Sequence, residues 1–195
     1  MMFKCQLVTV LVLGAIASFS SVQADDVTDS IQEASEAYAK GDHAKALEGL
    51  NYAVQLIQQA KAQGLEALLP QALAGWTAEK AESAAVGAAM FGGGITVDRR
   101  YTKGDSTINI QIVTDSPMLQ GMMALFTNPM FATSSGGKLE KVAGQKAIST
   151  YNATNQGGDY QFAIANKYMV TVKGQKVTEA DMKAYAEGID FKKME

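Results

Sequence analysis

The sequence predicts an α+β fold, in which a helical hairpin precedes an antiparallel sheet of about six strands. Residues 107–113 alternate apolar and polar side chains, and residues 95–101 do the same in part, which is the period of strands with one dry face. Residues 25–63 instead repeat apolar side chains every three or four positions, which is the period of helices. Because consecutive strand hairpins follow in the second half, we expect an antiparallel sheet.

The N-terminal 24 residues have the pattern of a secretory signal peptide. Lys4 is followed by an apolar run over residues 7–19 and by the small-residue exit Val22-Gln23-Ala24. The run is shorter than the roughly 20 residues that span a bilayer. We therefore expect cleavage after Ala24 and export, periplasmic in a cell with an outer membrane and extracellular as the alternative.

Composition narrows the function of the remaining 171 residues. The sole cysteine, Cys5, lies in the predicted signal peptide, so the exported chain has no thiol for catalysis, disulfides or thiolate metal sites. It carries 16 basic and 20 acidic residues, a net charge of −4, because Lys4 is the one charged residue before Asp25. Nucleic acid and anionic membrane surfaces are therefore poor candidate partners.

Residues 25–67 are predicted to form the helical hairpin. Asp29 or Ser30 is a candidate cap for the first helix, and Gly41-Asp42 ends it. The second helix, about residues 43–63, carries a stripe of Leu47, Leu50, Val54 and Ile57, with Ala46, Ala53 and Ala60 beside it. The short link makes the helices antiparallel, and we expect the pair to dock on the sheet domain.

The segment Ala37 to Asp42, with Ala46-Leu47, Leu50 and Ala53, resembles one tetratricopeptide repeat. In that family small residues let the two helices approach closely. A module that binds peptides is therefore the alternative to a docked hairpin.

Residues 68–195 are predicted to form the sheet domain, after a composition shift over residues 64–75. Its first element is a strand or helix at 83–91, and strands at 95–101 and 107–113 follow, joined through Lys103 to Asp105. A helix is predicted from Ser116-Pro117 to Phe126. Strands are then predicted at 138–142, 145–151, 160–165 and 168–173, and a last helix from Thr178 to about Glu187. Asn166-Lys167 suits a tight turn, Asp181 completes a capping box, and Gly188 ends the last helix. The tail 189–191 forms an edge strand or packs on the core.

Several motifs of this domain resemble an uncharacterised family of bacterial exported domains. They are Leu69-Pro70, Gly75-Trp76, the Tyr101 to Asp105 segment and the close of the alternating run at Thr114 to Ser116. The order of elements is also similar to that of the PsbP and Mog1 type of α/β domain. That likeness implies a role in assembly or interaction and supplies no active residue.

The methionines Met118, Met122, Met123 and Met130 form the richest cluster of one residue type. Thioethers are soft ligands that suit Cu(I). Methionine at helical spacing is also a common filler of uneven cores, and an exposed methionine patch would suit a partner or lipid. All three interpretations stay open at the level of sequence.

Other motifs give little chemistry. His43 is the single histidine and has no second ligand at metal-site spacing. The triple glycine of residues 92–94 precedes a strand, whereas phosphate loops lead from a strand into a helix, so we interpret it as a bulge or strand entry. We expect Trp76 in the core or at the seam between the two parts. The sequence predicts no catalytic residue, no cofactor and no metal site.

The remaining functional prediction is a surface that binds another protein. A mixed-charge patch is predicted near the hairpin tip, from Asp98, Arg99, Arg100, Lys103 and Asp105, and a solvated rim is the alternative interpretation. Arg99 and Arg100, with Lys103, are the residues predicted to bind a partner, because arginine is enriched at interfaces. The leading hypothesis is an exported, non-enzymatic interaction or accessory protein of the cell envelope. The alternatives are a small-ligand or lipid carrier using the sheet and the methionine-rich helix, and Cu(I) binding by the methionines.

Overall fold

The computed structural model describes residues 22–85, 94–116 and 136–195, together with the single positions 119, 121, 123 and 126. The chain divides into two compact units, residues 1–56 and 57–195. The division falls inside the second helix, ahead of the boundary over residues 64–75 that composition suggests.

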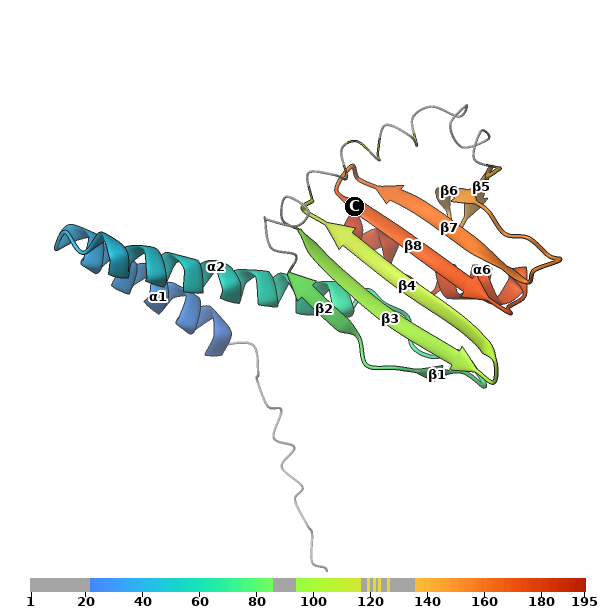
Figure 1. Cartoon of the computed structure of the whole chain (residues 1–195), viewed down its shortest axis with the longest axis horizontal. Helices are drawn as coiled ribbons and strands as arrows, with labels where there is room; N and C mark the ends of the chain where they lie inside the picture. The colour runs from blue at the N-terminus through green and yellow to red at the C-terminus, as the bar shows by residue number, and fades with distance from the viewer. Residues whose placement is uncertain are drawn as a thin grey trace, which may run out of the picture. The chain divides into compact units, whose positions relative to one another are not determined.

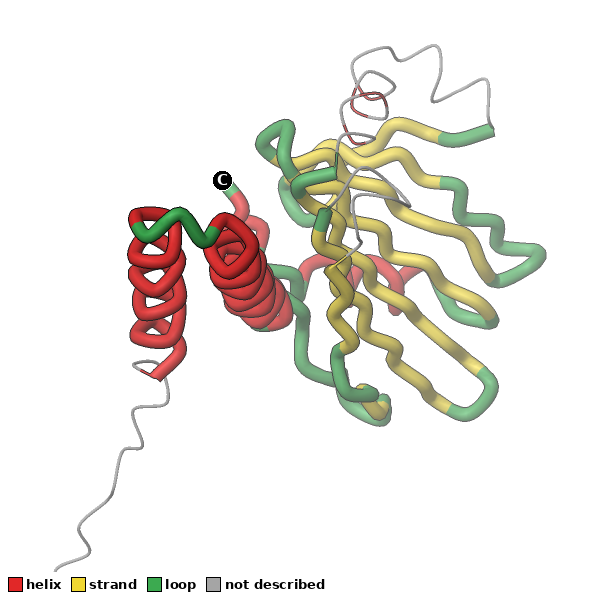
Figure 2. The backbone as a smooth tube through the Cα atoms, turned by 60° about the vertical axis from the view of Figure 1, so that its left-hand side comes forward, coloured by secondary structure: helices red, strands yellow, loops and turns green. Residues whose placement is uncertain are grey.

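The first unit consists of two helices joined by a short loop. Helix α1 spans Val22–Ala39 and helix α2 spans His43–Glu66, so α2 continues into the second unit. Figure 2 shows the two helices side by side. The helix–turn–helix prediction is confirmed, but α1 begins before the proposed cap, and the Ser30 hydroxyl instead donates to the backbone oxygen of Asp26 inside the helix.

The second unit is built on one antiparallel sheet of eight strands. These are β1 (Thr77–Ala78), β2 (Glu82–Ala85), β3 (Ile95–Lys103), β4 (Ser106–Thr114), β5 (Lys138–Val142), β6 (Gln145–Ser149), β7 (Gly157–Ile164) and β8 (Tyr168–Gln175). Their order is β1-β3-β4-β8-β7-β6-β5 (Figure 1). Strand β2 stands outside this order and also pairs with β3. The α+β prediction is confirmed. The count of about six strands misses short edge strands such as β1, which has no alternating pattern to reveal it.

Three tight turns set the register of this sheet. Gly104 takes a φ of +57° between β3 and β4, where Lys103 pairs with Ser106. Ala143 and Gly144 connect β5 to β6 with φ values of +54° and +80°. The turn between β7 and β8 is centred on Ala165 and Asn166, at +50° and +53°, one residue earlier than predicted. All three turns lie where the sequence breaks its alternation.

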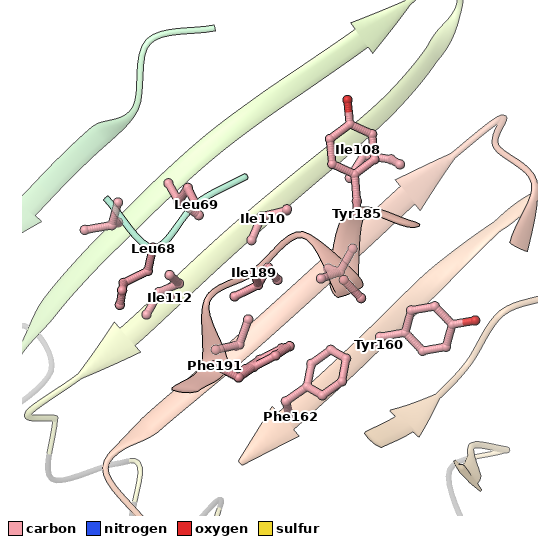
Figure 3. Packing of buried hydrophobic residues seen from close by; sticks show 14 of the residues in the cluster. Leu68, Leu69, Ile108, Ile110, Ile112, Tyr160, Phe162, Tyr185, Ile189 and Phe191 are labelled. Atoms are coloured by element: carbon pink, nitrogen blue, oxygen red, sulfur yellow. The ribbon is translucent and has the colours of Figure 1, made fainter. Parts of the chain in front are cut away.

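One face of the sheet carries the main core. The alternating residues Ile108, Ile110 and Ile112 of β4 point to this face and are fully buried. Figure 3 shows Tyr185, Ile189 and Phe191 from the C-terminal segment packing over them and over Phe162, with Leu68 and Leu69 beside. The last turns of α2 join the same core through Ala62 and Leu65.

The C-terminal segment covers that face as a capped helix. Helix α6 spans Glu179–Glu187, and Thr178 and Asp181 form the predicted capping box. Gly188 ends the helix in a right-handed conformation, and a side chain there would meet the Pro70 ring at 2.8 Å. The residue is therefore glycine for close packing and not for a left-handed turn. A 3₁₀ helix, η1 (Phe191–Met194), follows, so the tail packs on the core and adds no strand.

The opposite face carries a smaller apolar cluster. Leu119, Met123 and Phe126 are helical positions that pack with Val113, Ala163 and Met169. These positions share one side of a helix, as the sequence predicts for the segment after Ser116. Among the described residues, no helix combines the length and the apolar character that crossing a membrane requires.

Candidate functional site

The two helices of the first unit meet through small side chains. Ala34 and Ala37 of α1 and Ala46 and Ala53 of α2 are buried. A side chain added at Gly49 would lie 3.1 Å from the Ala34 Cβ. The helix axes are thus too close for a leucine between them, so the large apolar residues must lie elsewhere.

Those large apolar residues lie on the outside of the hairpin. Five of them, Ile31, Tyr38, Leu47, Leu50 and Val54, are exposed by 46%, 67%, 63%, 47% and 51%. The alanine row beside the leucine stripe of α2 makes the contact with α1, and the stripe itself is left exposed. We call these five residues the apolar hairpin face.

A simple rule of position places the five residues on one side of the hairpin. Each of the five comes directly after a residue that lies in the row between the two helices. The residues of that row are Ser30, Ala37, Ala46, Gly49 and Ala53. One step along a helix rotates a side chain by about 100°. Since the helices are antiparallel, the same rotation on both leads to the same side.

The stripe on α2 has the spacing of a helix-pairing seam. Leu47, Leu50 and Val54 are separated by three and four residues, and Ile57, 43% exposed, continues the series on the same helix. Such three-four spacing over two heptads is typical of helices that pair with other helices. At the loop end of α1, the ring of Tyr38 lies 5.4 Å from that of His43.

The other side of the hairpin is charged. An open groove of about 240 Å³ there is lined by Glu33, Lys45, Glu48 and Tyr52 among others. Each of these four residues comes directly before a residue of the row between the helices. One step back along the helix turns their side chains to the side opposite the apolar hairpin face. The hairpin therefore has one uncharged apolar side and one charged side.

The three basic residues predicted to bind a partner lie in different surroundings. Arg99 is in phase with the core residues of β3, and its Nη1 donates to the Pro70 backbone oxygen at 3.4 Å, while its buried Nε has no partner. Arg100 faces the other way and lies 3.9 Å from the Glu79 carboxylate. Lys103 Nζ lies 5.9 Å from the ring centre of Trp76. The structure does not bring the three together as one patch.

Trp76 lies in the core, which is one of the places that the sequence predicts for it. Its ring meets that of Tyr185 edge-on at 5.3 Å, and Tyr185 also contacts Tyr101 at 4.5 Å. The Tyr101 hydroxyl donates to the Pro70 backbone oxygen at 2.7 Å. Burial raises the pKa of Tyr101 to about 12, against the lowering effect of Arg99. This tyrosine is a neutral hydrogen-bond donor at ordinary pH.

Of the predicted methionine site, Met118, Met122 and Met130 lie outside the described residues. Met123 is described and buried, in contact with the small cluster that includes Met169. A cavity of about 140 Å³ beside it is lined by Phe126, Leu139 and Ile148 among others. This volume is below the roughly 300 Å³ at which pockets for drug-sized ligands begin.

A second group of titratable residues joins α6 to the sheet. Lys183 lies 2.8 Å from Glu179 and 3.5 Å from Glu140, and Glu179 accepts from the Tyr160 hydroxyl at 3.4 Å. Burial raises the pKa of Tyr160 to about 12, and the two glutamates add to this. The hydrogen bond from Lys183 lowers the pKa of Glu179. These contacts join α6 to β5 through Glu140 and to β7 through Tyr160.

Among the described residues, no three or more His, Cys, Asp or Glu side chains gather closely enough to hold a metal ion. Five of the exposed large apolar side chains in this part of the chain belong to the apolar hairpin face. Sequence periodicity located the leucine stripe of α2 but did not say whether it faces α1 or the solvent. The small-residue row Ala46, Gly49 and Ala53 was the signal for the correct assignment.

Comparison of the chain with protein families, with curated proteins and with solved structures found no match.

Proposed function

We propose that this chain is an exported, non-enzymatic accessory protein of the cell envelope that binds another protein chain through its apolar hairpin face. The observation that carries the proposal is the exposure of Leu47, Leu50 and Val54 at helix-pairing spacing on a hairpin whose own interface is already filled by small residues. Five large apolar side chains exposed on one side of a hairpin are more than scattered surface residues explain. The signal-like N-terminus supports export.

A helical partner suits this face best. Helices that carry apolar residues three and four positions apart bury them against another helix with the same repeat. The charged groove on the other side, with Glu33, Lys45 and Glu48, has no such repeat. The face therefore predicts recognition by apolar packing, with little dependence of binding on salt.

Site-specific crosslinking in the intact envelope tests the proposal. A photoreactive amino acid in place of Leu50 should capture a protein chain, because that position lies within the apolar hairpin face. The same amino acid in place of Tyr52, which is exposed to a similar degree on the other side of α2, is the matched control. Capture from neither position, or equal capture from both, would contradict the proposal.

The small-ligand alternative has one observation in its favour, the cavity beside Met123 and Phe126. Its volume of about 140 Å³ suits a fragment and not an acyl chain. Native mass spectrometry of the gently purified protein separates the two functions. A bound small molecule lost in a Met123→Trp variant would favour the carrier.

A further inference from the structure

We infer that the chain covering the apolar hairpin face is a second copy of this protein, and that the two hairpins pack as a four-helix bundle about a two-fold axis. This rests on the proposed function and names its partner. The charge and the symmetry of the face carry the inference, and its area sets the expected strength of the dimer.

The face carries no charge of its own. Residues 25–56 contain seven acidic and two basic side chains. Lys40 and Asp42 lie in the loop between the helices, and the helical period places the other charged residues away from the five apolar residues. The hairpin thus has a net charge of −5 on its other sides. A basic partner would select those sides. The apolar face instead fits a surface with the same uncharged character, and two copies meeting there oppose no like charges.

The geometry of the face is suited to pairing with itself. A two-fold interface uses the same patch on both copies, and a seam of three-four spacing is complementary to an identical seam. Each hairpin contributes two antiparallel helices, so two hairpins complete the four helices of a bundle. The large side chains excluded from the contact between Ala34 and Gly49 within each hairpin would then form the core between hairpins.

The available area predicts a weak, reversible dimer. Helix α1 has 18 residues, a length of about 27 Å at 1.5 Å per residue. Two helices packed at about 8–10 Å present a side roughly 17 Å wide. The interface then buries on the order of 900 Å² in total, which is below the roughly 1,200 Å² at which stable complexes begin and within the range of weak, transient ones. We expect a dissociation constant in the micromolar range.

Analytical ultracentrifugation of the purified protein, from about 1 to about 200 μM, tests the inference. The unmodified chain should show a reversible monomer–dimer equilibrium. Leu50→Ala should raise the dissociation constant at least about tenfold and Leu50→Glu at least about a hundredfold, since a two-fold interface loses each side chain twice. Tyr52→Glu, the matched control, should change it by less than about threefold.

Circular dichroism of each variant checks that the hairpin is folded. A monomer at the highest concentration, or equal effects of the Leu50 and Tyr52 substitutions, would overturn the inference. A monomer in vitro whose Leu50 position is crosslinked to a different protein in the envelope would overturn the identity of the partner and leave the proposed function standing. A monomer without such a crosslink would overturn both.

Discussion

At the scale of single residues, two kinds of position carry the most physical information, residues with left-handed backbone and buried tyrosines. Ala165 has a φ of +50° and Asn166 of +53° in the turn between β7 and β8. Glycine and asparagine accept this conformation more easily than alanine does. Asn166 fits its position, whereas Ala165 is held there by the strand pairing on either side.

Ala165→Gly should therefore stabilise the protein. Removing the Cβ relieves about 1 kcal/mol of left-handed strain, and the greater freedom of the unfolded chain offsets part of this, so we expect a gain of about 0.5 kcal/mol. The melting temperature should rise by roughly 1–2 °C. Ala163→Gly, on strand backbone in the same hairpin, should lower it. A loss of stability from Ala165→Gly would contradict this account of the turn.

Tyr101 and Tyr160 make stability depend on pH on the alkaline side. The pKa of each is raised to about 12 from an ordinary value of 10, chiefly by burial. The unfolded chain loses these protons first, so the tyrosines contribute fully below about pH 10, and their contribution falls as the pH rises toward 12. A shift of this size corresponds to on the order of 2 kcal/mol for each group.

Urea unfolding at about pH 8 and about pH 11 measures this effect. The unmodified protein should lose stability between the two, and the double variant Tyr101→Phe, Tyr160→Phe should lose distinctly less. At the lower pH the variant should be less stable, because the Pro70 backbone oxygen loses its hydrogen bond from Tyr101. An equal loss of stability in the two proteins would show that the buried tyrosines do not cause the loss of stability at high pH.

At the scale of elements, the hairpin depends on how closely α1 and α2 approach. Ala34 is almost fully buried against the backbone of α2 at Gly49. Ala34→Leu should force the helices apart and destabilise their contact by about 1–3 kcal/mol. Hydrogen exchange of α1 backbone amides should then speed up by roughly tenfold or more. Gln32→Leu, at an exposed position of the same helix, is the control, and equal protection in the two variants would contradict the close packing.

The sequence predicted the elements of this fold better than the directions in which their faces point. Periodicity placed the helices, the central strands, the capping box at Thr178 and the turn at Ala143-Gly144. In α2, however, the alanine row and the leucine stripe are one residue apart. A helical period says which residues share a side and not which side is inside.

The candidate site shows the same limit. The size of Ala46, Gly49 and Ala53 decides which row faces α1, because only small side chains permit the observed approach. Strand alternation similarly separates Arg99 from Arg100, since Arg99 is in phase with Val97 and Tyr101 of the core. Treating two adjacent strand residues as one patch overlooked that period. The contact of Arg99 with Pro70 joins residues 29 positions apart and had no local signal.

At the scale of the whole molecule, the two compact units differ in how completely they bury their apolar residues. The unit of residues 57–195 places most of its large apolar side chains in a main core that uses β3, β4, β7, β8 and α6, with a smaller cluster on the opposite face of the sheet. The unit of residues 1–56 buries mainly alanines and exposes leucine, isoleucine, tyrosine and valine. Helices in proteins gain most of their stability from packing of an apolar face, so covering this side would stabilise the hairpin further. The proposed role of the hairpin as a binding element rests on that imbalance.

The most direct test is the rate of thiol labelling at position 50 in the cell compared with the rate in dilute solution. The exported chain should contain no cysteine of its own, and Cys5→Ser secures this in any case, so Leu50→Cys and Tyr52→Cys each report one side of α2. If another chain covers the apolar hairpin face, the thiol at position 50 should be protected at least about tenfold in cells and should react freely once the purified protein is diluted. The thiol at position 52 should react freely in cells and in dilute solution. Equal labelling of the two positions in cells would contradict it.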